Sequence, residues 1–262
     1  MISDMKHIMN TDGSPLIIAG PCSAESRTQV LTTAGALHRA GVRIFRAGVW
    51  KPRTRPGGFE GYGELALPWL AEVKERFGML TATEVGTPRH AELALRAGID
   101  VVWIGARTTA CPFVTQEIAE ALRGTDIPVF VKNPASADLD LWIGAVERFA
   151  RCGLSRLGAI LRGFKTFIRP DDTCPPYRNT PFWEVADRFR AELPELPMLC
   201  DPSHIGGARC HIAPLSREAL SRGYDGLIIE THCNPAEAMT DAAQQLTPEA
   251  LARLMESIAV PV

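Results

Sequence analysis

Eight short apolar runs alternate with eight amphipathic stretches along most of the 262-residue chain. The runs are apolar at nearly every position, which is typical of strands buried on both faces of a parallel sheet. The sequence predicts strands at residues 16–19, 42–49, 79–85, 101–104, 129–132, 157–162, 198–200 and 226–230. It predicts helices at residues 28–39, 65–76, 88–96, 113–123, 139–151, 183–192, 215–221 and 248–257.

This alternation predicts an α/β fold with a single domain, the (β/α)8 TIM barrel. A doubly wound open sheet is the alternative. Eight units in about 250 residues, and no Gly-x-Gly-x-x-Gly motif after the first run, favour the closed barrel. We expect residues 1–15 to form an N-terminal extension or a cap over one end of the barrel, and residues 16–262 to form the catalytic barrel.

The composition limits the possible locations and partners of the chain. Its seven cysteines are scattered and odd in number, which favours a reducing cytoplasm over a disulfide framework. We see no signal segment and no apolar run of the roughly 20 residues that a membrane span needs. The formal net charge of -2 argues against a nucleic-acid partner. We therefore predict a soluble cytoplasmic protein that binds neither nucleic acid nor membrane.

Cationic side chains follow several of the predicted strands. In a barrel of this kind, functional groups gather at the carboxyl ends of the strands. Six cations at one mouth repel each other unless the ligand is strongly anionic. A solvated surface charge is the commoner reading for any one of them alone, but the whole set predicts a small ligand with several negative charges. The set is Arg46, Lys51, Arg53, Arg107, Lys132 and Arg162.

A second set of side chains has the chemistry of metal ligands: Cys22, His204, Glu230 and Asp241. They follow the first, seventh and eighth strands, which become neighbours when a barrel closes. A thiolate, an imidazole and two carboxylates suit a divalent ion such as Mn²⁺, Fe²⁺, Co²⁺ or Zn²⁺. The residues alone leave other roles open: a buried apolar thiol, a hydrogen-bonded core histidine and a helix cap. His232, two residues beyond Glu230, could orient a ligand.

The strand-end motifs resemble those of the 3-deoxy-D-arabino-heptulosonate-7-phosphate (DAHP) synthase family, in its type I-beta branch. That branch also includes 3-deoxy-D-manno-octulosonate-8-phosphate (KDO8P) synthase. The likeness extends from Leu16 to the C-terminus. The Lys-Pro-Arg-Thr run resembles the heptulosonate enzymes, because the octulosonate enzymes usually have an asparagine in this loop. The motifs are Gly20-Pro21-Cys22-Ser23, Arg46 with Lys51-Pro52-Arg53-Thr54, Gly105-Ala106-Arg107-Thr108, Asp201-Pro202-Ser203-His204 and Glu230-Thr231-His232-Cys233-Asn234-Pro235.

The resemblance implies a transferase that condenses phosphoenolpyruvate with D-erythrose 4-phosphate to give DAHP and phosphate. This is the first step of the shikimate pathway to aromatic amino acids. One alternative is a KDO8P synthase that uses arabinose 5-phosphate. Another is a non-catalytic barrel that binds a sugar phosphate or regulates a partner. A Schiff-base aldolase is disfavoured, because it needs a desolvated lysine and both candidates lie among arginines.

The resemblance also assigns roles to individual residues. It implies that Cys22, His204, Glu230 and Asp241 hold the divalent metal, for which Mn²⁺ is favoured over Fe²⁺, Co²⁺ and Zn²⁺. It implies that Arg46, Lys51 and Lys132 bind the carboxylate of phosphoenolpyruvate, and that Arg107 and Arg162 bind its phosphate. Arg53 and Thr54 would bind the phosphate of the acceptor. The implied catalytic residues are Lys51, Cys22, His204 and Glu84.

Some features depart from the family pattern or lie outside it. Arg55 stands where many relatives have serine, and Leu161 replaces the glutamate that usually precedes the arginine at position 162. We find no appended ferredoxin-like regulatory domain or chorismate mutase domain, and expect an enzyme insensitive to aromatic amino acids on its own. The family implies a homodimer or homotetramer, and a chorismate mutase partner in trans is conceivable. The long segment 165–181 is expected to be functional.

Overall fold

The eight predicted strands form a closed parallel barrel in the order of the sequence, which confirms the predicted fold. The structure, a computed structural model, describes residues 5, 8–10, 13–53, 55–166 and 175–259. The last strand pairs with the first, from Leu16 opposite Gly226 to Gly20 opposite Glu230. The strands are β1 (Leu16–Gly20), β2 (Ile44–Arg46), β3 (Leu80–Val85), β4 (Val101–Ile104), β5 (Val129–Lys132), β6 (Leu157–Leu161), β7 (Met198–Cys200) and β8 (Gly226–Glu230).

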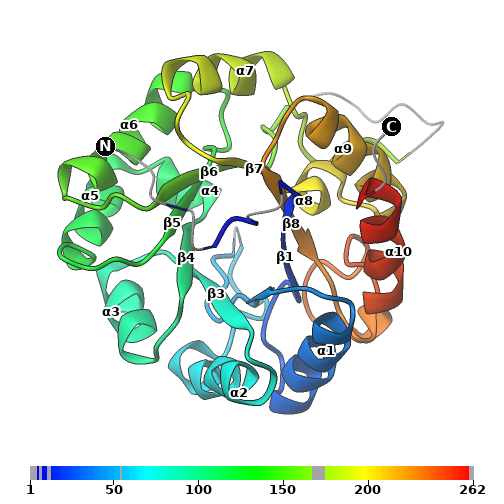
Figure 1. The fold of residues 1–262 in the computed structure, drawn as a ribbon. Helices are drawn as coiled ribbons and strands as arrows, with labels where there is room; N and C mark the ends of the chain where they lie inside the picture. Colours follow the sequence, from blue (N-terminus) through cyan, green and yellow to red (C-terminus); the bar gives the residue numbers. More distant parts are fainter. Residues whose placement is uncertain (1–4, 6–7, 11–12, 54, 167–174, 260–262) are drawn as a thin grey trace.

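Helices form an outer ring around the strands, as Figure 1 shows in a view along the barrel axis. The helices of the ring are α1 (Arg27–Arg39), α2 (Leu67–Phe77), α3 (Pro88–Arg96), α5 (Pro112–Ala121), α6 (Leu139–Arg151), α7 (Trp183–Glu192), α9 (Arg209–Ser221) and α10 (Pro248–Ala259). Four short helical turns interrupt the connections: η1 (Gly63–Ala66), α4 (Ala106–Thr109), α8 (Pro202–Gly206) and η2 (Pro235–Glu237). Two of them, α4 and α8, directly follow strands and carry predicted site residues.

Two elements differ from their predicted bounds by more than two residues. Strand β2 is only Ile44–Arg46 rather than 42–49, and beyond it the chain keeps a single isolated bridge between Gly48 and Ser23. Helix α9 begins at Arg209, six residues before its predicted start, and continues through Pro214. Proline usually marks a helix boundary because it has no N–H and clashes with the preceding turn. Pro214 nevertheless lies inside this helix and not at its start.

The barrel interior is filled by apolar side chains that point inward at every second strand position. They include Ile44, Trp103, Phe130, Ile160 and Ile228, all at most 2% exposed. Met5 and Ile8, from the segment before β1, pack into the same inner cluster. The described part of this segment lies across the centre of the ring in Figure 1. A larger outer cluster packs the helices against the strands.

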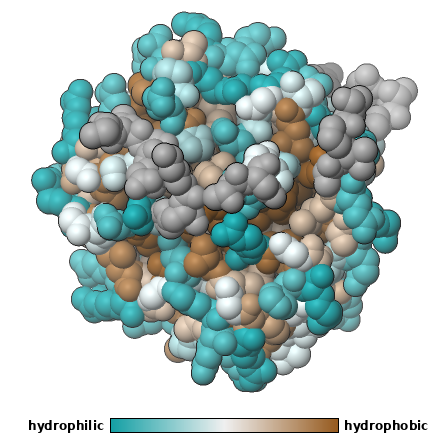
Figure 2. All heavy atoms as spheres, in the orientation of Figure 1, coloured by the Kyte–Doolittle hydropathy of each residue, from teal (hydrophilic) through white to brown (hydrophobic). Residues whose placement is uncertain are grey.

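Polar residues prevail at the rim of the face that Figure 2 shows. In Figure 2, which has the orientation of Figure 1, hydrophilic residues occupy much of the rim, and hydrophobic residues show mainly between them and toward the centre. Among the described residues, no helix combines the length and the apolar composition needed to cross a bilayer.

Candidate active site at the carboxyl end of the barrel

The strand register that fills the barrel also places charged side chains at its carboxyl end. Side chains two positions apart on a strand point to the same face. On six strands the inward apolar residue is followed, two positions later, by a charged one. These pairs are Ile44 and Arg46, Ala82 and Glu84, Phe130 and Lys132, Ile160 and Arg162, Leu199 and Asp201, and Ile228 and Glu230. The structure therefore gathers these predicted strand-end charges at one mouth.

Arg46 is a buried cation with unused hydrogen-bonding capacity. Its side chain is 1% exposed, and its guanidinium lies 4.8 Å from the centre of the Trp103 ring. Nη2 donates to the carbonyl of Cys22 at 3.1 Å and lies 3.5 Å from Glu230 Oε1. Within the described part of the chain, Nε and Nη1 have no hydrogen-bond partner. Since buried polar groups are almost always paired, these two donors indicate a place for an anionic ligand.

Lys51 reaches back to the same carbonyl. Its Nζ donates to the carbonyl oxygen of Cys22 at 3.0 Å. Burial alone would lower the pKa of Lys51, but the acidic groups of Cys22, Glu84 and Glu230 raise it above its usual value. The amine is therefore charged at neutral pH. This suits a cation that binds an anion and not a Schiff-base nucleophile, which needs a lowered pKa.

Three of the four predicted metal ligands form one compact group. One ligand atom from each of Cys22, Glu230 and Asp241 lies within 4.8 Å of the other two. The fourth, His204, directs Nε2 toward both carboxylates, 3.7 Å from Glu230 Oε1 and 3.9 Å from Asp241 Oδ2. Glu230 Oε1 is buried and has no hydrogen-bond partner among the described residues. The donor set therefore fits a divalent cation.

The protonation of this group depends on its burial. Burial, together with the charge of Glu230, raises the pKa of the Cys22 thiol to about 12. Burial also raises the pKa of Asp241, but His204 and Arg178 oppose it and lower that pKa to about 2. Without a cation the thiol thus keeps its proton and donates to Asp241 Oδ2 at 3.6 Å. A cation at this place would have to displace that proton.

Asp201 orients both a metal-ligand candidate and a cation. Its Oδ2 lies 2.8 Å from His204 Nδ1 and accepts a hydrogen bond from Lys132 Nζ at 2.7 Å. Burial would raise the pKa of Asp201, but His204 and Lys132 hold it well below its usual range. A carboxylate on Nδ1 leaves Nε2 of the imidazole to face the metal site, as is common for histidine ligands.

Glu84 lies at the mouth, close to the backbone of Gly105. Its Oε2 accepts a hydrogen bond from Trp103 Nε1 at 3.0 Å. A Cβ at position 105 would lie only 2.3 Å from Glu84 Oε1, so a larger residue there would displace this carboxylate. Beside Glu84 is a cavity of about 390 Å³, lined also by Lys51 and Arg53. Trp50 and His90, with ring centres 4.1 Å apart, stack in its lining.

Arg162 has two other arginines near it at the mouth. Burial lowers the pKa of Arg162 to about 10, and the nearby charges of Arg178 and Arg107 add to that effect. These cations are thus close enough to repel one another, which a bound anion would relieve. Arg107 lies in α4. Arg53 Nε donates to the carbonyl of Phe59 at 2.7 Å, whereas Thr54 lies outside the described residues.

Three residues of this site escaped the sequence reasoning: Trp103, Arg178 and Gln244. Trp103 was hidden in an apolar run. Arg178 Nη1 lies 3.1 Å from Asp241 Oδ1 and donates to Gln244 Oε1 at 2.7 Å. His232, expected as a possible orienting residue, lies with Nε2 3.5 Å from Glu25 Oε2. Of the long segment 165–181, residues 167–174 lie outside the described residues.

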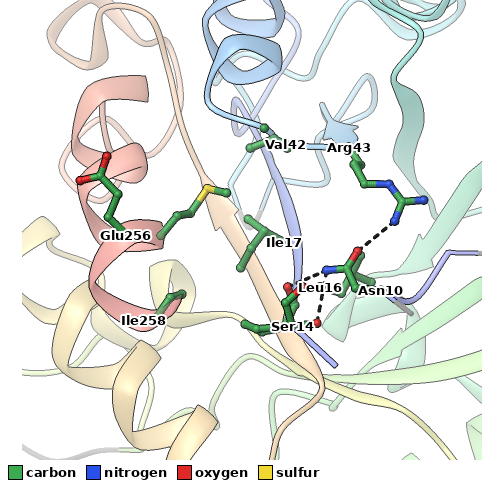
Figure 3. A pocket seen from close by; sticks show the side chains of 11 residues that line it. Asn10, Ser14, Leu16, Ile17, Val42, Arg43, Glu256 and Ile258 are labelled. Carbon is green, nitrogen blue, oxygen red and sulfur yellow. Dashed lines mark hydrogen bonds between the residues drawn. The ribbon is translucent and has the colours of Figure 1, made fainter. Parts of the chain in front are cut away.

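A different cavity, of about 520 Å³, lies at the amino end of the barrel. Figure 3 shows it between β1, the start of β2 and α10. Its lining includes Leu16, Val42, Arg43 and Glu256, and none of the predicted site residues. A larger volume therefore does not coincide with the gathered charges.

Comparisons with known proteins agree with this architecture. A family model described as the DAHP synthetase I family matches residues 1–259. The phospho-2-dehydro-3-deoxyheptonate aldolase of Thermotoga maritima is 33% identical over 261 residues, covering 98% of this chain and 72% of the relative. The 2-dehydro-3-deoxyphosphooctonate aldolase of Nitratidesulfovibrio vulgaris is 26% identical over 260 residues, covering 92% of this chain and 90% of the relative.

Solved structures give the same result. The crystal structure of DAHP synthase from Thermotoga maritima matches with a TM-score of 0.85 and 30% identity, over 99% of this chain and 72% of that chain. A truncated form of 3-deoxy-D-arabino-heptulosonate 7-phosphate synthase from the same organism matches with a TM-score of 0.82 and 28% identity, over 99% and 90%. Because the family model spans almost the whole sequence and the strand-end motifs agree with it, the chain belongs to the DAHP synthetase I family.

Proposed function

We propose that this chain is a DAHP synthase, which joins phosphoenolpyruvate to D-erythrose 4-phosphate and releases phosphate. One observation carries the proposal. The buried guanidinium of Arg46, two of whose nitrogens have no hydrogen-bond partner among the described residues, lies beside the Cys22, Glu230 and Asp241 cluster at the mouth of a barrel of this family. An anion-binding group next to a cation-binding group is what a metal-assisted reaction of an anionic substrate requires.

Phosphoenolpyruvate fits the cationic wall of the mouth. Its carboxylate would pair with Arg46, Lys51 and Lys132, which approach from β2, the loop after it and β5. Its phosphate would lie between Arg107 and Arg162. An anion there would offset the burial and the neighbouring positive charges that lower the pKa of Arg162. Guanidinium groups suit both ends of this substrate because they bind carboxylate and phosphate with two parallel hydrogen bonds.

Erythrose 4-phosphate fits the cavity beside Glu84. We assign its phosphate to Arg53, which lines this cavity, and, as the family resemblance implies, to Thr54. Its aldehyde would then extend toward the metal ligands, with Lys51 between the two substrates. A volume of about 390 Å³ is within the range of small-molecule sites. Glu84 would support the phosphoenolpyruvate side or direct a water.

Cys22, His204, Glu230 and Asp241 would hold a divalent cation, with Mn²⁺ favoured. When bound, such an ion acts as a Lewis acid that polarises the aldehyde oxygen of the acceptor. Asp201 contributes by fixing the ring of His204 through Nδ1. Gln245 contributes by accepting the backbone N–H of Cys22 at 2.9 Å, which fixes the chain that carries the thiol.

The reaction forms a C–C bond and a C–O bond to water, and it breaks the C–O bond to phosphate. C3 of phosphoenolpyruvate attacks the aldehyde carbon, whose oxygen takes up a proton to become a hydroxyl. Water adds at C2, and phosphate leaves from C2 with cleavage of the C–O bond, so that C2 becomes the ketone of DAHP. The side chains of the mouth mainly hold two anions that would otherwise repel one another, with the reacting carbons in contact.

The deciding experiment measures phosphate release and product identity with phosphoenolpyruvate and erythrose 4-phosphate. Parallel reactions contain arabinose 5-phosphate, EDTA, or EDTA followed by added Mn²⁺. We expect DAHP formation that EDTA abolishes and Mn²⁺ restores. Turnover of arabinose 5-phosphate alone would identify a KDO8P synthase. Metal binding without turnover of either sugar would favour a non-catalytic barrel that binds sugar phosphates.

We carry over from the family a homodimer or homotetramer in the cytoplasm. The isolated chain is expected to be insensitive to aromatic amino acids, and a chorismate mutase acting in trans is one partner that could regulate it. Strong inhibition of the isolated chain by phenylalanine or tyrosine, measured in the same phosphate-release assay, would contradict this expectation.

A further inference from the structure

The short segment before α7 is fastened across the helix that carries His204. Arg178 and Asn179 donate their backbone N–H groups to the carbonyls of Gly206 and Ile205, at 3.4 and 3.1 Å. The side chain of Asn179 donates to the carbonyl of His204 at 2.6 Å. A Cβ at Gly207 would lie 2.5 Å from the Cβ of Arg178, so glycine is needed where the two segments cross. The segment thus has a fixed position next to α8.

From this position Arg178 reaches over to the loop after β8. Its Nη1 lies 3.1 Å from Asp241 Oδ1 and donates to Gln244 Oε1 at 2.7 Å. Asp241 has a left-handed backbone, with φ of 49°, which is uncommon for a residue other than glycine. An aspartate in such a conformation persists when its surroundings hold it there. The ion pair with Arg178 provides such a restraint.

Gln244 extends the restraint to a second metal-ligand candidate. Its Nε2 donates to Glu230 Oε2 at 2.7 Å and approaches Asp241 Oδ2 at 3.4 Å. Glu230 is fully buried, and its other oxygen, Oε1, faces His204 Nε2 at 3.7 Å. Each carboxylate therefore has one oxygen bound by another side chain. Arg178 pairs with Oδ1 of Asp241, and Gln244 donates to Oε2 of Glu230. The other oxygen of each faces the centre of the cluster.

We propose that Arg178, acting directly on Asp241 and through Gln244 on Glu230, is a positioning residue that sets the affinity of the metal site. The inference rests on the metal site of the proposed function. An ordinary surface ion pair of a 44% exposed arginine would contribute little. Arg178 differs because one of its partners, Gln244, in turn donates a hydrogen bond to the fully buried carboxylate of Glu230. Partners that orient metal ligands typically change metal affinity 10–100-fold when they are lost.

The test measures Mn²⁺ binding without substrates, by equilibrium titration of the metal-free protein. We expect Arg178→Met to raise the Kd for Mn²⁺ about 10–100-fold. Gln244→Met, a second variant that leaves Arg178 in place, should also raise the Kd for Mn²⁺. Arg222→Met is the matched control, because Arg222 is a 35% exposed arginine that pairs with Glu218 at 2.6 Å, away from the site. Its Kd should equal that of the unaltered protein.

The outcomes separate this inference from the proposed function. If the unaltered protein does not bind Mn²⁺, the metal site itself is wrong. If it binds Mn²⁺ and both variants, still folded by circular dichroism, bind it equally well, only the role of Arg178 is overturned. Turnover of Arg178→Met should recover at saturating Mn²⁺. A loss that saturating metal does not relieve would mean that Arg178 contacts a substrate, and would also overturn the positioning role.

Discussion

The two ends of the barrel are both hollowed, but they differ in how their polar groups are paired. At the amino end, Asn10 Nδ2 donates to the carbonyls of Ser14 and Pro15, and Arg43 Nη1 donates to Asn10 Oδ1 at 2.9 Å (Figure 3). At the carboxyl end, two nitrogens of Arg46 and one oxygen of Glu230 lie buried without hydrogen bonds from the described residues. The amino end has the cavity of about 520 Å³. Most of the buried side-chain atoms that lack a hydrogen bond from the described residues belong to residues of the carboxyl end, the hydroxyl of Tyr224 before β8 being the exception.

This difference shows which feature of a barrel identifies its working end. A buried polar group without a partner costs about 1–3 kcal/mol, so a chain selected only for stability would not keep several of them together. Apolar hollows with paired edges carry no such cost. Buried polar groups without hydrogen-bond partners at the strand ends therefore indicate a ligand site better than the volume of a cavity does.

The largest expected effect comes from removing a cation of the carboxyl end. We expect Lys51→Ala to lower kcat/KM by on the order of 10³-fold, because Lys51 lies between the two proposed substrates. The control is Lys74→Ala, which removes a half-exposed lysine paired with Asp100 on the outer ring and should leave turnover unchanged. Steady-state phosphate release measures both. Near-normal turnover of Lys51→Ala would remove the main support for the proposed mechanism.

Arg162 offers a direct comparison of the two ends. Arg162→Met should raise the KM for phosphoenolpyruvate about 30-fold or more, since a buried charge that meets the phosphate is lost. The free energy of unfolding without ligand should stay unchanged or rise, because burial and nearby arginines disfavour the charged side chain. Arg43→Met at the amino end should do the reverse, with unchanged KM and slightly lower stability. Urea unfolding and initial rates test both variants, and a large loss of stability in Arg162→Met would contradict the comparison.

Much of this contrast could be predicted from the sequence, because it follows from strand periodicity. Apolar runs at the right spacing predicted all eight strands, and the charged residues toward the carboxyl ends of several runs predicted Arg46, Lys132 and Glu230 at one mouth. What could not be predicted depends on contacts between distant segments. Nothing near Arg178 in the sequence indicates that its loop crosses α8 to reach Asp241. The hydrogen bond between Asn10 and Arg43 also joins segments far apart in the sequence, and it is part of what pairs the polar groups at the amino end.

Metal binding should depend on pH in a direction set by Cys22. Its pKa of about 12 means that the thiol is protonated at neutral pH and must release a proton to bind a metal. We therefore expect the affinity for Mn²⁺ to increase up to about tenfold for each unit of rising pH near neutrality. Calorimetry in buffers with different ionisation enthalpies should detect about one released proton. In Cys22→Ser, which has no thiol to deprotonate, we expect weaker binding with less proton release. Equal release from both proteins would place the proton elsewhere.

The smallest effect is expected at the paired amino end, with Asn10→Ala. This change removes the side-chain bonds to Ser14, Pro15 and Arg43, and should cost about 1 kcal/mol of unfolding free energy. Turnover and Mn²⁺ affinity should stay within about twofold of the unaltered protein, because the barrel interior separates this cavity from the charged mouth. Ser257→Ala, which loses one local bond to the carbonyl of Leu254 in α10, is the control for a change with no cross-segment contact. If Asn10→Ala instead altered the KM for either substrate severalfold, the two ends would be coupled, and pairing of polar groups would no longer separate a structural hollow from a functional one.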